Sequence, residues 1–301
     1  MPRIRVFAPA KINLCLHVTG QRPDGYHLLD TLVGFASVGD WVTLDTRQKR
    51  GLTIEGPESA ALDPAAPNLV MQTAMEFWGK GMGRLGLTLT KHLPVSSGIG
   101  GGSADAAATF RGILWVMDHR GKDLPTDTTL VRRLLALGAD VPMCVMSDAA
   151  HVRGIGEVMA PVALPPLPLL LVNPRVPVPT PAVFKALTRK DNPAPPPLPT
   201  DLKGPEPLIR WLQDQRNDLQ LPATEIAPVI GTVLHALAAL PGCALARMSG
   251  SGATCFGIFT SDAEAEQAAT LLRKSHPDWW ITATRLNSQT RVEPQVIRDT
   301  T

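Results

Sequence analysis

The chain contains two kinds of hydrophobic pattern, one with a two-residue period and one with helical spacing. Leu85, Leu87 and Leu89 occupy alternate positions, as in a strand with one buried face, whereas Leu130 and Leu134 recur with the spacing of a helix face. The predicted strands are residues 3–8, 12–18, 28–37, 40–45, 51–55, 85–91, 167–172, 244–248 and 254–260. The predicted helices are residues 68–78, 106–117, 128–137, 226–240 and 262–273.

Prolines are concentrated between residues 161 and 207, so this region is not expected to form a continuous helix. Within it, residues 191–207 are predicted to form an exposed loop. We place a domain boundary just before this proline-rich region, which gives predicted domains of residues 1–155 and 156–301.

Composition narrows the class of protein. The chain has 301 residues, 44% hydrophobic and 19% charged, which is ordinary for a soluble globular protein. A net charge of +2 without a basic block argues against nucleic-acid binding. The four cysteines share no short spacing that would indicate zinc or a disulfide framework, and the apolar run at 161–172 is too short to cross a membrane. We therefore expect a reduced cytoplasmic enzyme with no membrane partner.

The glycine-rich stretch between the strand at 85–91 and the helix at 106–117 is the strongest chemical signal. Glycines let backbone N–H groups approach a phosphate closely, and the free N–H groups of a helix N-terminus point at the same charge. A nucleotide is the expected ligand. The predicted phosphate-binding residues are Pro94, Val95, Ser96, Ser97, Gly98, Ile99, Gly100, Gly101, Gly102, Ser103 and Ala104.

This stretch differs from three familiar phosphate-binding patterns. The chain has no Gly-Lys-Ser/Thr triplet, and Ser103 stands where a dinucleotide fingerprint needs a third glycine. No His-Arg-Asp segment follows, as it would in a protein kinase. A plain glycine-rich turn is the alternative. Three consecutive glycines followed by a serine favour the phosphate loop.

The glycine-rich stretch is similar to the second motif of the GHMP kinases, the superfamily of galactokinase, homoserine kinase and mevalonate kinase. Four further segments extend the resemblance in the family's order, and they are residues 8–14, 22–27, 137–142 (Leu-Gly-Ala-Asp-Val-Pro) and 248–256. With Val178-Pro-Thr-Pro181, this set resembles the GHMP kinases that act on 4-diphosphocytidyl-2-C-methyl-D-erythritol. The resemblance covers nearly the whole chain.

The resemblance implies a fold and an activity. The fold would be α+β with two domains: an N-terminal ATP-binding domain, a C-terminal ferredoxin-like α/β domain and a cleft between them. The activity would be transfer of the γ-phosphate of ATP, with Mg²⁺, to the 2-hydroxyl of 4-diphosphocytidyl-2-C-methyl-D-erythritol. This small-molecule reaction belongs to the non-mevalonate (methylerythritol phosphate) pathway of isoprenoid synthesis.

The resemblance also implies catalytic roles. Asp140 matches the general base, and Lys11 matches the lysine that orients it. Ser103 is expected to cap the helix after the phosphate loop and is a candidate Mg²⁺ contact; no other metal ligand is assigned. The third motif, which lines the same cleft, is Ser249, Gly250, Ser251 and Gly252.

Recognition of the substrate is implied in the same way. Tyr26 and Phe184 match two aromatic residues that sandwich a cytosine ring, and His27 matches a residue that hydrogen-bonds the base. Asn13 and Thr180 match groups near the methylerythritol hydroxyls.

Other interpretations stay open. Taken alone, Asp140 is typical of a turn or helix cap, and Lys11 of a solvated edge lysine. Another GHMP kinase, of homoserine or mevalonate type, should lack the turn at residues 22–27. A non-catalytic nucleotide-binding member should have lost Lys11 or Asp140, and both are present.

Overall fold

The computed structural model describes residues 3–63, 65–79, 83–125, 129–287 and 292–297. Its strands are β1 (Arg3–Gln21), β2 (His27–Asp45), β3 (Gly51–Glu55), β4 (Gly86–Thr90), β5 (Ala150–Gly154), β6 (Val158–Pro161), β7 (Leu167–Asn173), β8 (Leu245–Met248), β9 (Cys255–Ile258), β10 (Trp280–Leu286) and β11 (Gln295–Ile297). Its helices are the 3₁₀ turn η1 (Ser59–Ala61) and α1 (Leu69–Phe77), α2 (Gly101–His119), α3 (Leu130–Leu137), α4 (Val141–Met146), α5 (Thr180–Ala186), α6 (Pro205–Gln213), α7 (Gln220–Ile226), α8 (Val229–Ala238) and α9 (Asp262–Ser275).

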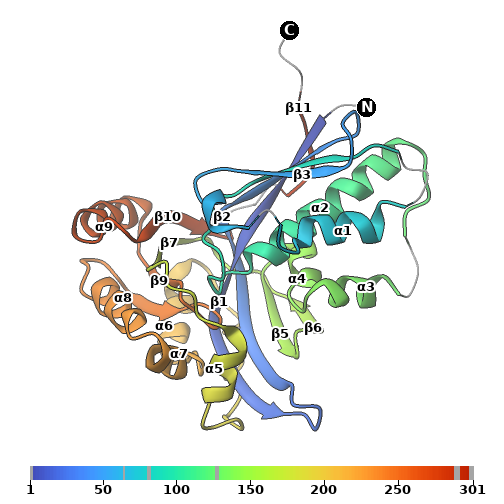
Figure 1. Cartoon of the computed structure of the whole chain (residues 1–301). Coiled ribbons are helices and arrows are strands. Elements are labelled where there is room, and N and C mark those ends of the chain that lie inside the picture. Colours follow the sequence, from blue (N-terminus) through green and yellow to red (C-terminus); the bar gives the residue numbers. More distant parts are fainter. Residues whose placement is uncertain (1–2, 64, 80–82, 126–128, 288–291, 298–301) are drawn as a thin grey trace.

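A long antiparallel hairpin of β1 and β2 forms the centre of the molecule (Figure 1). The main sheet has the order β11-β1-β2-β10-β7-β9-β8, and β2 also pairs with β4 and β5. A single register pair, Leu286 with Ala36, joins β10 to β2 and so connects the two halves of the sheet. The fold is therefore α+β, as predicted, with one continuous sheet running through both halves.

Helices cover the two halves of this sheet separately. In Figure 1, α1 to α4 lie on one side of the β1–β2 hairpin and α6 to α9 lie on the other. β1 contributes to the core on each side, because Ile4 and Val6 pack with the first group of helices and Leu16 and Val18 with the second. The boundary between residues 155 and 156 stays a prediction, and β1 belongs to the packing of both halves.

Most predicted elements are confirmed, and several have different ends. The two strands predicted within β1 are one strand, because a register shift between Pro9 and Lys11 lets the ladder continue past the proline. The strands predicted at 28–37 and 40–45 likewise merge into β2. Residue 128, the predicted start of α3, lies outside the described residues.

Short elements without a clear period were missed. They include α4 to α7, β5, β6, β10 and β11. The predicted loop at 191–207 ends early, since α6 begins at Pro205, a residue whose fixed φ suits the first turn of a helix. Within the described ranges, no helix is long and apolar enough to span a bilayer.

A backbone contact inside the central hairpin gives a test of this architecture. Gly39 pairs with Pro9, and a Cβ at Gly39 would lie 2.2 Å from the carbonyl oxygen of Ala8. Because backbone would have to move, we expect Gly39→Ala to lower the free energy of unfolding by about 1–3 kcal/mol in urea denaturation. Gly51→Ala is the matched control, since nothing lies within 4 Å of its added Cβ. Equal stability of the two variants would contradict the hairpin geometry.

Candidate active site

Lys11 and Asp140 form an ion pair although they lie far apart in the chain. Lys11 is in β1, and its Nζ is 2.9 Å from Oδ2 of Asp140, which directly precedes α4. The Lys11 side chain is 7% exposed and that of Asp140 is 38% exposed, so the carboxylate is open to a ligand on one side. Lys11 Nζ also donates to Oδ1 of Asn13 at 3.0 Å. The structure therefore brings three predicted site residues together.

The glycine-rich loop is packed directly against Lys11. The Lys11 backbone N–H donates to the carbonyl oxygen of Ile99 at 2.9 Å. Gly100 has a left-handed φ of +65°, and a Cβ there would lie 3.3 Å from Lys11 Cβ and Cε. Glycine is needed at this position both for the backbone conformation and for the approach to Lys11.

Helix α2 begins inside the glycine run, five residues before the predicted start. The first ladder bond of this helix runs from Ala104 N–H to the carbonyl oxygen of Gly100, so the N–H groups of residues 101–103 belong to the open first turn. Gly102 is exposed there. The predicted cap at Ser103 is wrong, because the N-cap position is Gly100 and Ser103 lies within the first turn. The exposed N-terminus has the form of an anion-binding site.

A buried cluster of three ionisable residues lies next to this helix N-terminus. Lys91 Nζ donates to Oδ2 of Asp40 and, at 3.1 Å, to Oδ2 of Asp105 in α2. Oδ1 of Asp40 accepts the N–H groups of His92 and Leu93 at 2.6 and 2.8 Å. The cluster therefore attaches both ends of the phosphate loop to β2.

Sequence reasoning missed this cluster, although each member had a weak signal. Lys91 ends an apolar strand, and Asp105 interrupts an alanine-rich helix. A Cβ at Gly101 would lie 3.1 Å from Lys91 Nζ, so this glycine leaves room for the buried lysine. Gly101 thus faces the cluster, and Gly102 is the exposed glycine of the first turn.

Arg111 is a second functional residue that the sequence did not reveal. Its Nη1 donates to the carbonyl oxygens of Cys144 and Val145 at the end of α4, and its Nη2 donates to that of Phe7 in β1. Burial lowers the pKa of Arg111 to about 10. This contact fixes the helix that follows Asp140 to the strand that carries Lys11. Its only sequence signal is a charge within an apolar helix.

The third motif contacts both the phosphate loop and β1. Ser249 Oγ donates to the carbonyl oxygen of Gly98 at 3.2 Å and accepts the Asn13 N–H at 3.1 Å. Gly250 has a φ of +56°, and a Cβ there would lie 2.7 Å from the Gly98 oxygen. Ser251 Oγ lies 2.7 Å from Thr180 Oγ1. Asn13 and Thr180 therefore both contact the third motif, which in turn contacts the phosphate loop through Ser249.

Two of the predicted base-binding residues, His27 at the start of β2 and Phe184 in α5, contact each other. The His27 and Phe184 rings are stacked with centroids 4.9 Å apart and 26° between planes, while Tyr26 is 60% exposed. His27 Nε2 is buried and has no hydrogen-bond partner in the described part of the chain. Burial, with a smaller effect from Lys190, lowers the pKa of His27. The predicted sandwich of Tyr26 and Phe184 stays a prediction.

Comparison with known proteins identifies the family. Residues 68–148 match the model of the GHMP kinases N terminal domain, and residues 184–278 match that of the GHMP kinases C terminal domain. The 4-diphosphocytidyl-2-C-methyl-D-erythritol kinase of Roseobacter denitrificans is 52% identical over 95% of this chain and 94% of its own. This chain belongs to the 4-diphosphocytidyl-2-C-methyl-D-erythritol kinase family of GHMP kinases.

Further relatives agree with this assignment. The enzyme of the same name from Dinoroseobacter shibae is 52% identical over 93% of this chain and 94% of its own. A crystal structure of 4-(cytidine 5'-diphospho)-2C-methyl-D-erythritol kinase matches with a TM-score of 0.74 and 31% identity, covering 94% of this chain and 98% of that one. A homoserine kinase from Cytophaga hutchinsonii, 19% identical with a TM-score of 0.61 and covering 99% and 98% of the two chains, shares the fold.

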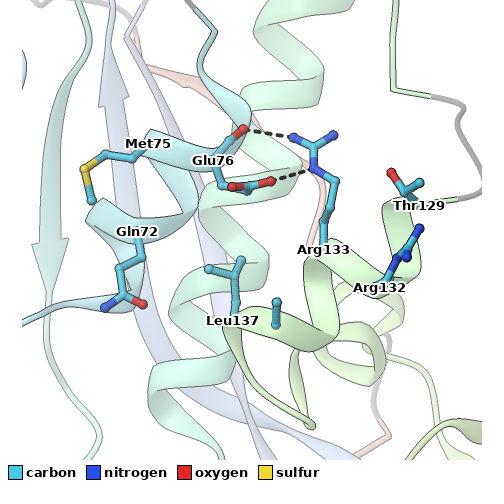
Figure 2. Close-up of a pocket in the computed structure, with 8 residues that line it drawn as sticks. Gln72, Met75, Glu76, Thr129, Arg132, Arg133 and Leu137 are labelled. Atoms are coloured by element: carbon cyan, nitrogen blue, oxygen red, sulfur yellow. Dashed lines mark hydrogen bonds and ion pairs between the residues drawn. The ribbon is translucent and has the colours of Figure 1, made fainter.

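A groove of about 640 Å³ lies between α1 and α3 of this GHMP kinase (Figure 2). None of the site residues chosen from the sequence lines it. Figure 2 shows Arg133 bridging the groove to Glu76, with Nε 2.6 Å from Oε1, and the guanidinium lies 4.4 Å from the Phe77 ring centroid. These contacts fix α3, which leads directly to the turn that carries Asp140.

The buried cluster predicts a pH dependence of stability. Burial raises the pKa of Asp105 to about 8 from its ordinary value of 3.8, and the Lys91 charge offsets part of that effect. Because the folded chain binds this proton more tightly than the unfolded chain, Asp105 contributes stability below about pH 4 that is lost as pH rises through about 8. We expect Asp105→Asn, which cannot ionise, to gain stability relative to the parent as pH increases from 5 to 9 in urea titrations.

The exposed Asp201 supplies the control for that measurement. Asp201→Asn makes the same chemical change at an exposed position and should not reproduce the effect of Asp105→Asn. If the free energy of unfolding of Asp105→Asn depends on pH in the same way as that of the parent, Asp105 does not carry this proton in the folded chain.

Proposed function

We propose that this chain transfers the γ-phosphoryl group of ATP to the 2-hydroxyl of 4-diphosphocytidyl-2-C-methyl-D-erythritol, a step in the methylerythritol phosphate route to isopentenyl diphosphate. The observation that carries the proposal is the Lys11–Asp140 pair, 2.9 Å apart and next to the glycine loop at the start of α2. Close relatives named for this substrate support the choice of alcohol.

The reaction needs a positioned hydroxyl, a proton acceptor and charge around the transferred group. The exposed side of Asp140 accepts the proton of the substrate 2-hydroxyl, the hydroxyl oxygen forms its bond to the γ-phosphorus, and the bond to the β-bridging oxygen breaks to leave ADP. Lys11, fixed by Asn13, orients the carboxylate and offers positive charge beside the phosphoryl group. N–H groups of the first turn of α2 hold the phosphates.

The residues present fit a Mg²⁺ ion that is held mainly by ATP. The described residues contain no group of three or more His, Cys, Asp or Glu side chains that would form a protein cage. Mg²⁺ in kinases commonly takes one or two protein oxygens and the substrate phosphates. Ser103, half-buried in the first turn of α2, offers such an oxygen. When bound, the ion would neutralise charge on the phosphate oxygens.

Recognition of the cytidine group rests on the junction of the hairpin with α5. Nε2 of His27, which has no hydrogen-bond partner among the described residues, offers a hydrogen bond to the base, and the exposed ring of Tyr26 offers a surface for stacking. Phe184 lies against His27 and supplies the second aromatic surface. Asn13 and Thr180, both in contact with the third motif, are the residues we assign to the polyol.

The first test removes the proton acceptor. Asp140→Asn keeps the shape of the side chain and loses its basicity, so kcat should fall by roughly 10²–10⁴-fold while ATP affinity holds. Coupled assay of ADP release with 4-diphosphocytidyl-2-C-methyl-D-erythritol, homoserine and mevalonate measures both the loss and the choice of alcohol. Asp148→Asn, at an exposed aspartate just after α4, is the control. Turnover of Asp140→Asn within a few-fold of the control would exclude the assignment.

A second test concerns the base. Tyr26→Ala should raise the KM for the cytidine substrate by about 5- to 150-fold, the equivalent of roughly 1–3 kcal/mol of stacking, and leave ATP affinity near that of the parent. Tyr26→Phe retains the ring and should behave like the parent. CMP should compete with the cytidine substrate. An unchanged KM in Tyr26→Ala, with CMP competing against ATP alone, would move the cytidine site elsewhere.

A further inference from the structure

One bidentate ion pair joins two segments that the functional argument above does not use. Arg175 Nη1 donates to Glu58 Oε2 at 2.5 Å, and Nη2 donates to Oε1 at 2.8 Å. The Glu58 side chain is 5% exposed and that of Arg175 is 47% exposed. Two parallel bonds fix both the distance and the orientation of the two groups, which a single contact would not do. The pair therefore acts as a rigid link between its two segments.

The Glu58 end of the link is attached to the base of the phosphate loop. Glu58 N–H donates to the carbonyl oxygen of Lys91 at 3.1 Å, and Lys91 N–H donates to that of Glu55 at 2.7 Å. Gly56, with a φ of +101°, permits this approach, since a Cβ there would lie 2.6 Å from the Lys91 oxygen. Lys91 is the buried lysine that also holds Asp105 of α2. Glu58 is thus fixed to the nucleotide side.

The Arg175 end of the link belongs to the substrate side. Arg175 lies between β7 and α5, the helix that carries Thr180 and Phe184. Its φ is +60°, a conformation that non-glycine residues adopt rarely and that persists where contacts fix it. Its N–H donates to Oδ1 of Asn173 at 2.7 Å. The pair with Glu58 is therefore one of the contacts that hold the chain entering α5.

We propose that Glu58 and Arg175 are positioning residues that clamp residues 174–186 to the base of the phosphate loop, so that ATP and the cytidine substrate strengthen each other's binding. This proposal rests on the proposed function for the identity of the second ligand. Loss of Arg175 frees the segment before α5 and leaves a buried carboxylate without its partner. In that variant, ATP bound at the phosphate loop would no longer order residues 174–186, and the cytidine substrate would no longer order the phosphate loop.

Calorimetry measures this coupling directly. A non-hydrolysable ATP analogue and 4-diphosphocytidyl-2-C-methyl-D-erythritol are titrated separately and then each in the presence of the other. In the parent, each should tighten the other by roughly 5- to 150-fold, and in Arg175→Ala this factor should fall to about 1–2. The analogue alone should bind the variant as it binds the parent. In steady state, the KM for the cytidine substrate should rise more than kcat falls.

Arg285→Ala is the matched control. Arg285 also forms a bidentate pair, with Nε 2.7 Å from both carboxylate oxygens of Asp262, but this pair is more exposed and joins β10 to α9 within one half of the molecule. The control removes one arginine and one bidentate pair and should keep the coupling factor. Arg175→Lys retains the charge without the two parallel bonds and should be intermediate, which a merely electrostatic role would not predict.

Amide hydrogen exchange tests the clamp without any bound ligand. In the ligand-free protein, amides of residues 174–186 should exchange faster in Arg175→Ala and in Glu58→Gln than in Arg285→Ala. Unchanged exchange, with an unchanged coupling factor in a folded Arg175→Ala, would overturn the clamp. A parent that turns over no cytidine substrate would instead refute the proposed function, and the exchange result would then decide the clamp by itself.

Discussion

The site depends on the close approach of three backbone segments that only glycine allows. The phosphate loop lies against Lys11 through Gly100 and against the third motif through the contact of Gly250 with the Gly98 oxygen. A side chain at any of these glycines would meet backbone or the Lys11 side chain at 2.6–3.3 Å. These contacts hold β1 and the third motif against the phosphate loop. Segments from both halves of the chain therefore meet beside the N-terminus of α2.

Two charged residues, Lys91 and Arg111, connect the elements that surround this site. Lys91, which is buried, connects the end of β4 to β2 and α2, and the half-buried Arg111 connects α2, α4 and β1. A buried charge is costly unless it is paired or hydrogen-bonded, so each of these contacts has a narrow range of permitted geometry. A fixed geometry suits a kinase, because phosphoryl transfer depends on the relative positions of the base and the phosphate.

Sequence patterns predicted the parts of this site that are local. The glycine stretch and the segments around Lys11, Asp140 and Ser249 each contain a pattern that can be recognised within a few residues. Helix α2 began earlier than predicted because glycines count against a helix interior but are tolerated in its first turn. Short helices such as α4 and α5 were missed because six or seven residues show no clear period.

Ion pairs between residues that lie far apart in the sequence show no such pattern within a few residues. Nothing near Glu58 indicates Arg175, and nothing near Asp40 indicates Lys91, because each partner is supplied by a different element of the folded chain. A charged residue inside an apolar strand or helix is the one available sign, and it shows that a partner exists without naming it. The residues assigned to the chemistry lie in local motifs and could be proposed from the sequence, whereas the residues that hold these motifs in place could not.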